Sequence, residues 1–89
     1  MPEDQITVYG TDWCGDCRRA VNYLKQNQIP FTWINIDNNQ AAELYVLKIN
    51  QGYRSVPTIL FSDGSVLVEP SNEQLAAKIN SSVRDESLT

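Results

Sequence analysis

Apolar and polar residues alternate along the first third of the chain in a pattern that predicts a strand, a helix and a second strand. Residues 6–9 (Ile-Thr-Val-Tyr) form a β-branched and aromatic run typical of a strand. Apolar side chains then recur at helical spacing between about Cys14 and Asn27, and residues 31–36 predict the next strand after Pro30 ends the helix. A strand, helix and strand in about 30 residues form a right-handed βαβ unit, so we expect the two strands to be parallel.

A second helix is predicted after the βαβ unit. Residues 37–40 (Asp-Asn-Asn-Gln) supply several possible N-caps at its start, and among them Asp37 and Gln40 have the spacing of a capping box. Gly52 is a natural carboxyl-terminal cap near its end. The expected inner face consists of Ala42, Tyr45, Val46 and Ile49. This stripe indicates a helix that packs on a sheet.

The last third of the chain predicts a hairpin followed by a third helix. Residues 58–61 and 66–68 are short strand-like runs joined by Ser-Asp-Gly-Ser, which is a strong hairpin signal. Ser71 and Gln74 have the spacing of a second capping box. The expected inner face of the helix after them consists of Leu75, Ile79 and Val83.

The element order βαβαββα predicts one α/β domain, with a four-stranded mixed sheet flanked by helices. A chain of 89 residues has the length of a single domain, and no composition shift or repeat divides it. Beyond Arg84 the chain is polar, and we expect a disordered tail from about residue 85.

The candidate chemistry lies in residues 13–17 (Trp-Cys-Gly-Asp-Cys), which hold both cysteines of the chain. Cys14 falls where the first strand gives way to the first helix, so the unpaired N–H groups and positive end of that helix favour its thiolate. The carboxylate of Asp16 opposes this effect, and we expect moderate activation. Cys17, one helical turn further along, is expected to be more buried.

Charge and composition narrow the possible functions. The net charge is -4, with only seven Lys and Arg residues, which argues against nucleic acid as a partner. No apolar run approaches the ~20 residues of a membrane span. The first residues are acidic where a signal peptide would be basic, so we expect a cytoplasmic protein.

Two cysteines in a reducing compartment point to redox or metal chemistry rather than to a structural disulfide. The chain has no His, and two thiolates alone would leave half of a tetrahedral zinc shell empty. A redox pair is therefore the leading interpretation, and we expect no resident metal.

The segment Trp-Cys-Gly-Asp-Cys after a first strand, followed by Ser55-Val56-Pro57 before a third, resembles the thioredoxin fold. Within that fold the chain is most similar to the glutaredoxin-like bacterial proteins called mycoredoxins, from about Ile6 to Ile79. The resemblance implies a cis peptide bond before Pro57, which would place the backbone of Val56 opposite Cys14.

The resemblance also implies which residues surround the sulfur. Val56 would pair with the cysteinyl part of a small thiol, and Arg54 and Trp13 would face that thiol or a protein partner. Two positions depart from the glutaredoxins that use glutathione. Residues 68–72 (Val-Glu-Pro-Ser-Asn) replace a Gly-Gly-acidic segment, and Asp16 replaces a common aromatic residue.

The function implied is a thiol–disulfide oxidoreductase that reduces protein disulfides or mixed disulfides between proteins and a small thiol. Cys14 would attack and Cys17 would resolve, with mycothiol or glutathione as electron donor and no tightly bound cofactor. Three alternatives stay open. One is a dithiol electron donor of the ribonucleotide-reductase type, recharged by a flavin enzyme such as thioredoxin reductase. The others are a carrier of a bridged iron–sulfur cluster and a non-catalytic binding module. Nothing in the sequence requires more than a monomer.

Overall fold

The computed structural model describes residues 6–88, with side chains described for residues 6–80. Its strands are β1 (Ile6–Gly10), β2 (Phe31–Asn35), β3 (Thr58–Leu60) and β4 (Val66–Val68). Its helices are α1 (Gly15–Gln26), α2 (Gln40–Ile49) and α3 (Asn72–Leu88), and a 3-10 turn, η2 (Ile36–Asn38), follows β2. The predicted order and the α/β fold class are confirmed.

The four strands form one mixed sheet in the order β2-β1-β3-β4. As predicted for a βαβ unit, β1 and β2 are parallel, with Gly10 opposite Asn35. β3 is antiparallel to β1 and to β4, with Thr58 opposite Tyr9 and Val68. One end of the sheet therefore gathers the ends of β1, β2 and β4 and the start of β3.

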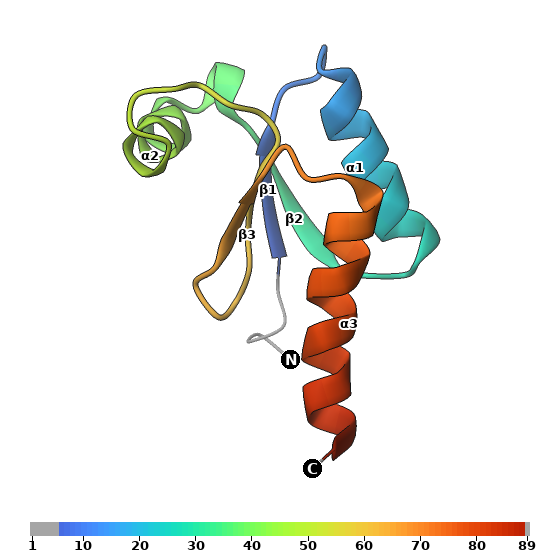
Figure 1. Cartoon of the computed structure of the whole chain (residues 1–89). Helices are drawn as coiled ribbons and strands as arrows, with labels where there is room; N and C mark the ends of the chain where they lie inside the picture. Colours follow the sequence, from blue (N-terminus) through green and yellow to red (C-terminus); the bar gives the residue numbers. More distant parts are fainter. Residues whose placement is uncertain (1–5, 89) are drawn as a thin grey trace.

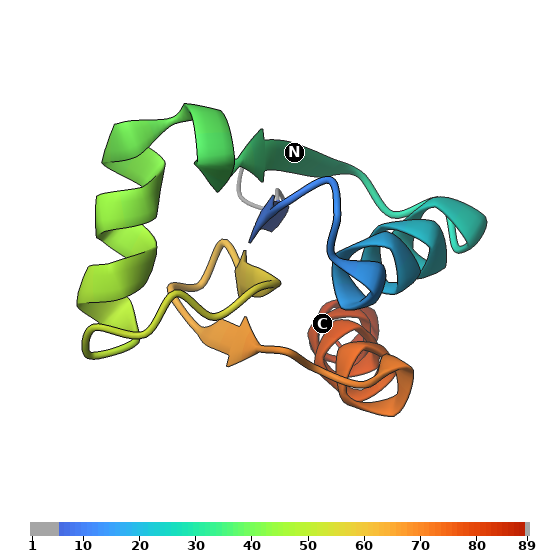
Figure 2. The same cartoon turned by 90° about the horizontal axis from the view of Figure 1, so that it is seen from above.

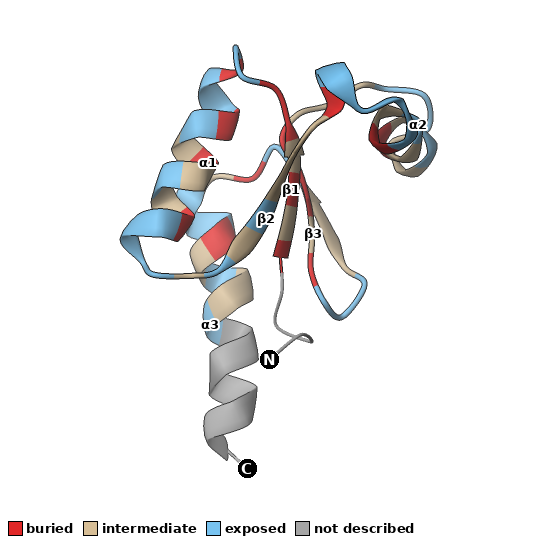
Figure 3. Cartoon of the chain, turned by 180° about the vertical axis from the view of Figure 1, so that it is seen from behind, coloured by how far each residue is buried: buried red, intermediate tan, exposed pale blue. Residues whose placement is uncertain are grey.

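The helices cover the sheet on both faces. Figures 1 and 2 show α1 and α3 side by side on one face and α2 on the other. The larger core cluster lies under α1 and α3, and its buried members are Ile6, Val8, Ala20, Leu24, Ile59, Phe61 and Leu75. A smaller cluster under α2 has the buried members Ile36, Ala42 and Val46. Figure 3 shows these buried positions on the sides of the helices that face the sheet.

Of the possible caps predicted for the second helix, Asn39 is the N-cap, and the predicted capping box of Asp37 with Gln40 was wrong. The strand ends at Asn35, and residues 36–38 form η2, in which the Asn35 side chain accepts the N–H of Asp37. The cap of α2 is Asn39, whose side chain accepts the N–H of Ala42. Asp37 does not cap the helix because its carboxylate is occupied by Trp13 and Arg54.

The predicted capping box of the third helix is present. Ser71 Oγ accepts the backbone N–H of Gln74 at 3.1 Å, and Gln74 Oε1 accepts the backbone N–H of Ser71 at 2.8 Å. These bonds fix the turn that leads from β4 into α3. Leu75, the first inward residue of α3, is fully buried.

Ser71→Ala is expected to lower the free energy of unfolding by about 1 kcal/mol, because the N–H of Gln74 loses its acceptor. Urea denaturation measures this change. Ser71→Thr keeps a hydroxyl acceptor and should stay within about 0.5 kcal/mol of wild type. Equal losses in both variants would show that the box does not stabilise α3.

Side chains beyond residue 80 lie outside the described residues, and this includes Val83 and the segment after Arg84. The expected disorder from about residue 85 stays a prediction. Within the described residues, no helix combines the length and the apolar character needed to cross a bilayer.

Candidate active site

The sulfur of Cys14 lies at the amino terminus of α1. Cys14 is the N-cap residue, with extended backbone, and the backbone N–H of Cys17 donates to its Sγ at 3.2 Å. On the other side, the Cys14 thiol donates to the carbonyl oxygen of Val56 at 3.8 Å. Only 8% of Cys14 is exposed. A backbone donor and the positive end of a helix both stabilise negative charge on this sulfur.

Cys17 lies one turn further along α1 and is more deeply buried, with 1% of its surface exposed. Burial is the main cause that raises the pKa of its thiol, to about 12, and the hydrogen bond it donates to the Cys14 sulfur adds to the effect. The two cysteines thus have different environments. One sulfur lies at a helix end and the other is held as a buried thiol.

Iodoacetamide at pH 8 is expected to alkylate the folded, reduced protein once, at Cys14. With a pKa of about 12, Cys17 holds only a very small thiolate fraction at this pH, and that fraction rises about tenfold with each pH unit. Alkylation of Cys17 should therefore accelerate as the pH rises from 8 to 10, and should be complete at pH 8 in denaturant. Peptide mapping by mass spectrometry locates the adducts. Two adducts forming at equal rates at pH 8 would contradict the assigned environments.

The segment before β3 supplies the surface opposite Cys14. The expected cis peptide bond joins Val56 to Pro57, and Pro57 is buried. The carbonyl of Pro57 accepts the backbone N–H of Glu69 at 2.8 Å, which ties the segment to the end of β4. The backbone of Val56 faces Cys14 as the sequence resemblance implied.

Trp13 and Arg54 both bond the carboxylate of Asp37, which the sequence predicted as part of a helix cap. The indole Nε1–H of Trp13 donates to Asp37 Oδ2 at 2.8 Å, and Arg54 pairs with the other oxygen, Oδ1, of the same carboxylate. Arg54 Nε also contacts Glu43 Oε2 at 2.5 Å. The bonds from Arg54 and Trp13 hold the pKa of the Asp37 carboxyl below its ordinary value.

Comparison with known proteins agrees with this geometry. The family model described as Glutaredoxin matches residues 6–66, which include the cysteine pair and the segment before β3. The chain belongs to the glutaredoxin family.

Its similarity to individual glutaredoxins covers most of the chain. A protein of Mycobacterium tuberculosis whose name assigns it to the glutaredoxins is 42% identical over 74 residues, which are 83% of this chain and 88% of that protein. Mycoredoxin 1 of Corynebacterium glutamicum is 35% identical over 74 residues, or 83% of this chain and 91% of that one. The crystal structure of a glutaredoxin from Archaeoglobus fulgidus matches with a TM-score of 0.69 at 25% identity, covering 85% of this chain and 86% of that one.

Asp16 is exposed in the first turn of this glutaredoxin's α1 and lies 3.8 Å from Arg19 Nε. The Arg19 guanidinium also donates to the carbonyl oxygen of Pro70 at 2.8 Å and to Asn72 Oδ1 at 2.6 Å. Arg19 therefore fixes the segment between β4 and α3 to the helix that carries the cysteines. The charge of Asp16 adds to the raised pKa of the Cys17 thiol, and its carboxylate is partly engaged by this arginine.

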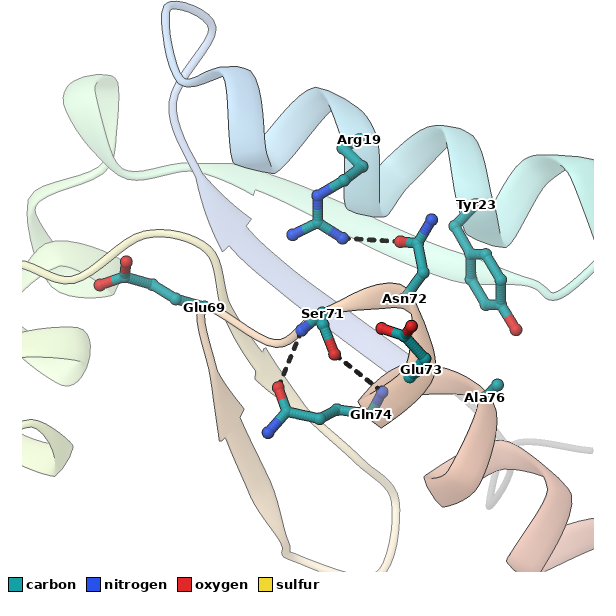
Figure 4. A pocket seen from close by; sticks show the side chains of 8 residues that line it. All are labelled: Arg19, Tyr23, Glu69, Ser71, Asn72, Glu73, Gln74 and Ala76. Carbon is teal, nitrogen blue, oxygen red and sulfur yellow. Dashed lines mark hydrogen bonds between the residues drawn. The ribbon is translucent and has the colours of Figure 1, made fainter.

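A cavity of about 760 Å³ opens between α1 and the start of α3. Figure 4 shows its lining, which consists of Arg19, Tyr23, Glu69, Ser71, Asn72, Glu73, Gln74 and Ala76. Glu69 precedes the buried Pro70 and donates its N–H to Pro57, so the cavity adjoins the segment opposite Cys14. Its lining includes part of residues 68–72, where the sequence departs from glutathione-using glutaredoxins.

Among the residues that the structure describes, no three His, Cys, Asp or Glu side chains gather in a way that could hold a metal ion. The thiols of Cys14 and Cys17 are the available soft ligands, and they would leave half of a tetrahedral shell to other molecules.

Two features of the site are not predicted from the sequence. One is the contact of Asp37 with Trp13 and Arg54, and the other is the close approach of Cys17 and Trp33 to Gly10. A topological signal for Asp37 was available, because it follows a strand predicted to be parallel to β1, and parallel strands end at the same edge of the sheet. For Gly10 the signal is steric and becomes visible only when Cys17 and Trp33 are placed around it.

Proposed function

We propose that this glutaredoxin is a thiol–disulfide oxidoreductase that reduces mixed disulfides between proteins and a small thiol, with Cys14 as the nucleophile. The observation that carries the proposal is the position of the Cys14 sulfur. It caps α1, accepts the N–H of Cys17 and lies against the carbonyl of Val56. A thiolate there is stabilised at one side and faces the backbone of Val56 at the other, along which a disulfide substrate can align.

The reaction consists of two exchanges. The Cys14 thiolate attacks the small-thiol sulfur of the mixed disulfide, which releases the protein thiolate and leaves the small thiol bound to Cys14 through a new S–S bond. A second small-thiol molecule, as thiolate, then attacks that sulfur and releases the symmetrical small-thiol disulfide, and Cys14 is restored. In the net reaction, the protein sulfur is reduced from the disulfide to the thiol level and the sulfur of the second small-thiol molecule is oxidised from the thiol to the disulfide level, while the sulfur of the first small thiol stays at the disulfide level.

Cys17 would serve a second, intramolecular route. In that route its sulfur attacks the adduct on Cys14, releases the small thiol and closes a Cys14–Cys17 disulfide, which a further reductant must open. Because burial raises the pKa of the Cys17 thiol, this attack is slow at neutral pH. The first route is therefore favoured with a small thiol in excess.

Other residues would bind the small thiol or the protein substrate and would not take part in the exchange itself. The backbone of Val56, held by the cis bond to Pro57, would pair with the cysteinyl part of the thiol. Trp13, which is 67% exposed beside Cys14, would cover the incoming group, and Arg54 and Asp16 would border it. The cavity between α1 and α3 would take the remainder of the small thiol.

Mycothiol is the small thiol that we propose. The similarity to Mycoredoxin 1 supports it, as does the absence of a Gly-Gly-acidic segment at residues 68–72. We place the reaction in the cytoplasm, where thiols are kept reduced, with thiol-modified proteins as partners.

Turnover of a protein mixed disulfide with mycothiol, glutathione, or NADPH and thioredoxin reductase as the only electron source tests the proposal. We expect turnover with mycothiol and much less with glutathione. Turnover with thioredoxin reductase alone would overturn the proposal in favour of a dithiol electron donor. A visible chromophore after anaerobic iron and sulfide reconstitution, without turnover from any donor, would favour an iron–sulfur carrier.

A further inference from the structure

Asp37 joins the two segments that border the Cys14 sulfur. One segment is the loop before α1, in which Trp13 immediately precedes Cys14, and the other is the connection to β3, in which Arg54 lies two residues before Val56. Asp37 Oδ2 accepts from Trp13 and Oδ1 from Arg54, so each oxygen holds a different segment. Asp37 comes from a third element, η2, because β2 ends at the same edge of the sheet as β1.

Trp13 has little packing to hold it. With 67% of its surface exposed, its ring is free to adopt several rotamers unless a polar contact fixes it. The contact with Asp37 joins residues 24 positions apart and is the hydrogen bond found for its indole N–H. The ring orientation beside Cys14 therefore depends on this carboxylate.

Arg54 is turned toward acidic groups of its own chain. Its guanidinium pairs with Asp37 and with Glu43 of α2, and about a third of its side chain is exposed. Two carboxylates around one guanidinium leave the cluster of Arg54, Asp37 and Glu43 without a net positive charge. The arginine thus braces the connection to β3 against η2 and α2, and its charge is already satisfied before any substrate binds.

We propose that Asp37 is a positioning residue for disulfide binding, which holds the Trp13 ring and the segment before Val56 in a fixed relation across the Cys14 sulfur. This inference rests on the proposed function, since it concerns the substrate that Cys14 attacks. Asp37 touches neither sulfur, so it acts on substrate binding more than on the exchange itself.

The test combines steady-state kinetics with the mobility of the Trp13 indole. Asp37→Ala is expected to raise the KM for a protein mixed disulfide about fivefold, with kcat within about twofold of wild type. The reason is that the Trp13 ring and the segment before Val56 are no longer held in place for contact with the substrate. The Trp13 indole order parameter, from ¹⁵N relaxation, should fall below about 0.6. Its resonance is assigned by its absence in Trp13→Phe.

Three variants distinguish positioning from general destabilisation. Asp37→Asn keeps an oxygen acceptor and should restore the order of the indole. Glu43→Ala removes the other partner of Arg54 and should leave the indole ordered. Asp63→Ala is the matched control, because Asp63 also bonds a cation and a neighbouring serine but lies in the β3–β4 turn at the far end of the sheet.

An unchanged KM in Asp37→Ala, or an equal loss in the Asp63→Ala control, would overturn the inference. An indole that stays ordered in Asp37→Ala would overturn it as well, and this readout does not depend on turnover. Failure of the proposed function has a different signature, since wild type itself would then not turn over the mixed disulfide with any small thiol.

Discussion

Cys14→Ser is expected to reduce turnover of a mixed disulfide by more than about 100-fold, whereas Cys17→Ser retains most of the activity when a small thiol is supplied in excess. A serine hydroxyl at position 14 stays protonated at neutral pH and cannot form the mixed disulfide. Cys17, by contrast, holds a proton up to a pH of about 12 and contributes mainly to the slower intramolecular route. Initial rates with a mycothiolated protein substrate measure both effects.

Both variants exchange sulfur for oxygen without a large change in volume, so they are matched controls for each other. Thermal unfolding checks that each is folded. An active Cys14→Ser protein would contradict the assignment of the nucleophile. A Cys17→Ser protein as inactive as Cys14→Ser would show instead that turnover passes through the intramolecular disulfide.

Gly10→Ala is expected to destabilise the protein by about 1–3 kcal/mol, because no space exists for a methyl group at the end of β1. A Cβ at Gly10 would lie 2.6 Å from Cys17 Sγ and 2.8 and 2.9 Å from ring atoms of Trp33. Cys17 cannot move away easily, since it is part of α1 and only 1% of its surface is exposed. The added methyl should therefore also displace the Cys17 sulfur and slow closure of the Cys14–Cys17 disulfide.

Gly15→Ala is the matched control for this substitution. Gly15 begins α1 next to Cys14, and nothing lies within 4 Å of its ideal Cβ position. Alanine favours helix over glycine, so this variant should be as stable as wild type or slightly more stable. Urea denaturation compares the two. A stable Gly10→Ala protein with unchanged disulfide closure would show that the end of β1 has room to relax.

Much of the fold was predictable because each element carries its own local signal. The βαβ unit, the Asp-Gly hairpin and the Ser71 capping box depend on residues close together in sequence, and all are present. The error at Asp37 has the opposite cause. Its spacing to Gln40 suits a cap, but tertiary partners 24 and 17 residues away take up its carboxylate and leave the cap to Asn39.

The candidate site was partly predictable for the same reason. The position of Cys14 at a strand-to-helix junction follows from the pattern around it, and the similarity to mycoredoxins implied that Val56 lies opposite. The lack of space between Gly10 and the Cys17 sulfur depends on packing between elements that are distant in sequence. The same holds for the pairing of Arg54 with Asp37 and Glu43.

The most direct test of the central claim is the mass of the Cys17→Ser protein after brief incubation with a mycothiol mixed disulfide. We expect one mycothiol bound per chain, on Cys14, and its release when free mycothiol is added. This result would demonstrate both exchanges at the sulfur that caps α1. A protein that takes up no adduct, or an equal adduct in Cys14→Ser, would contradict the account.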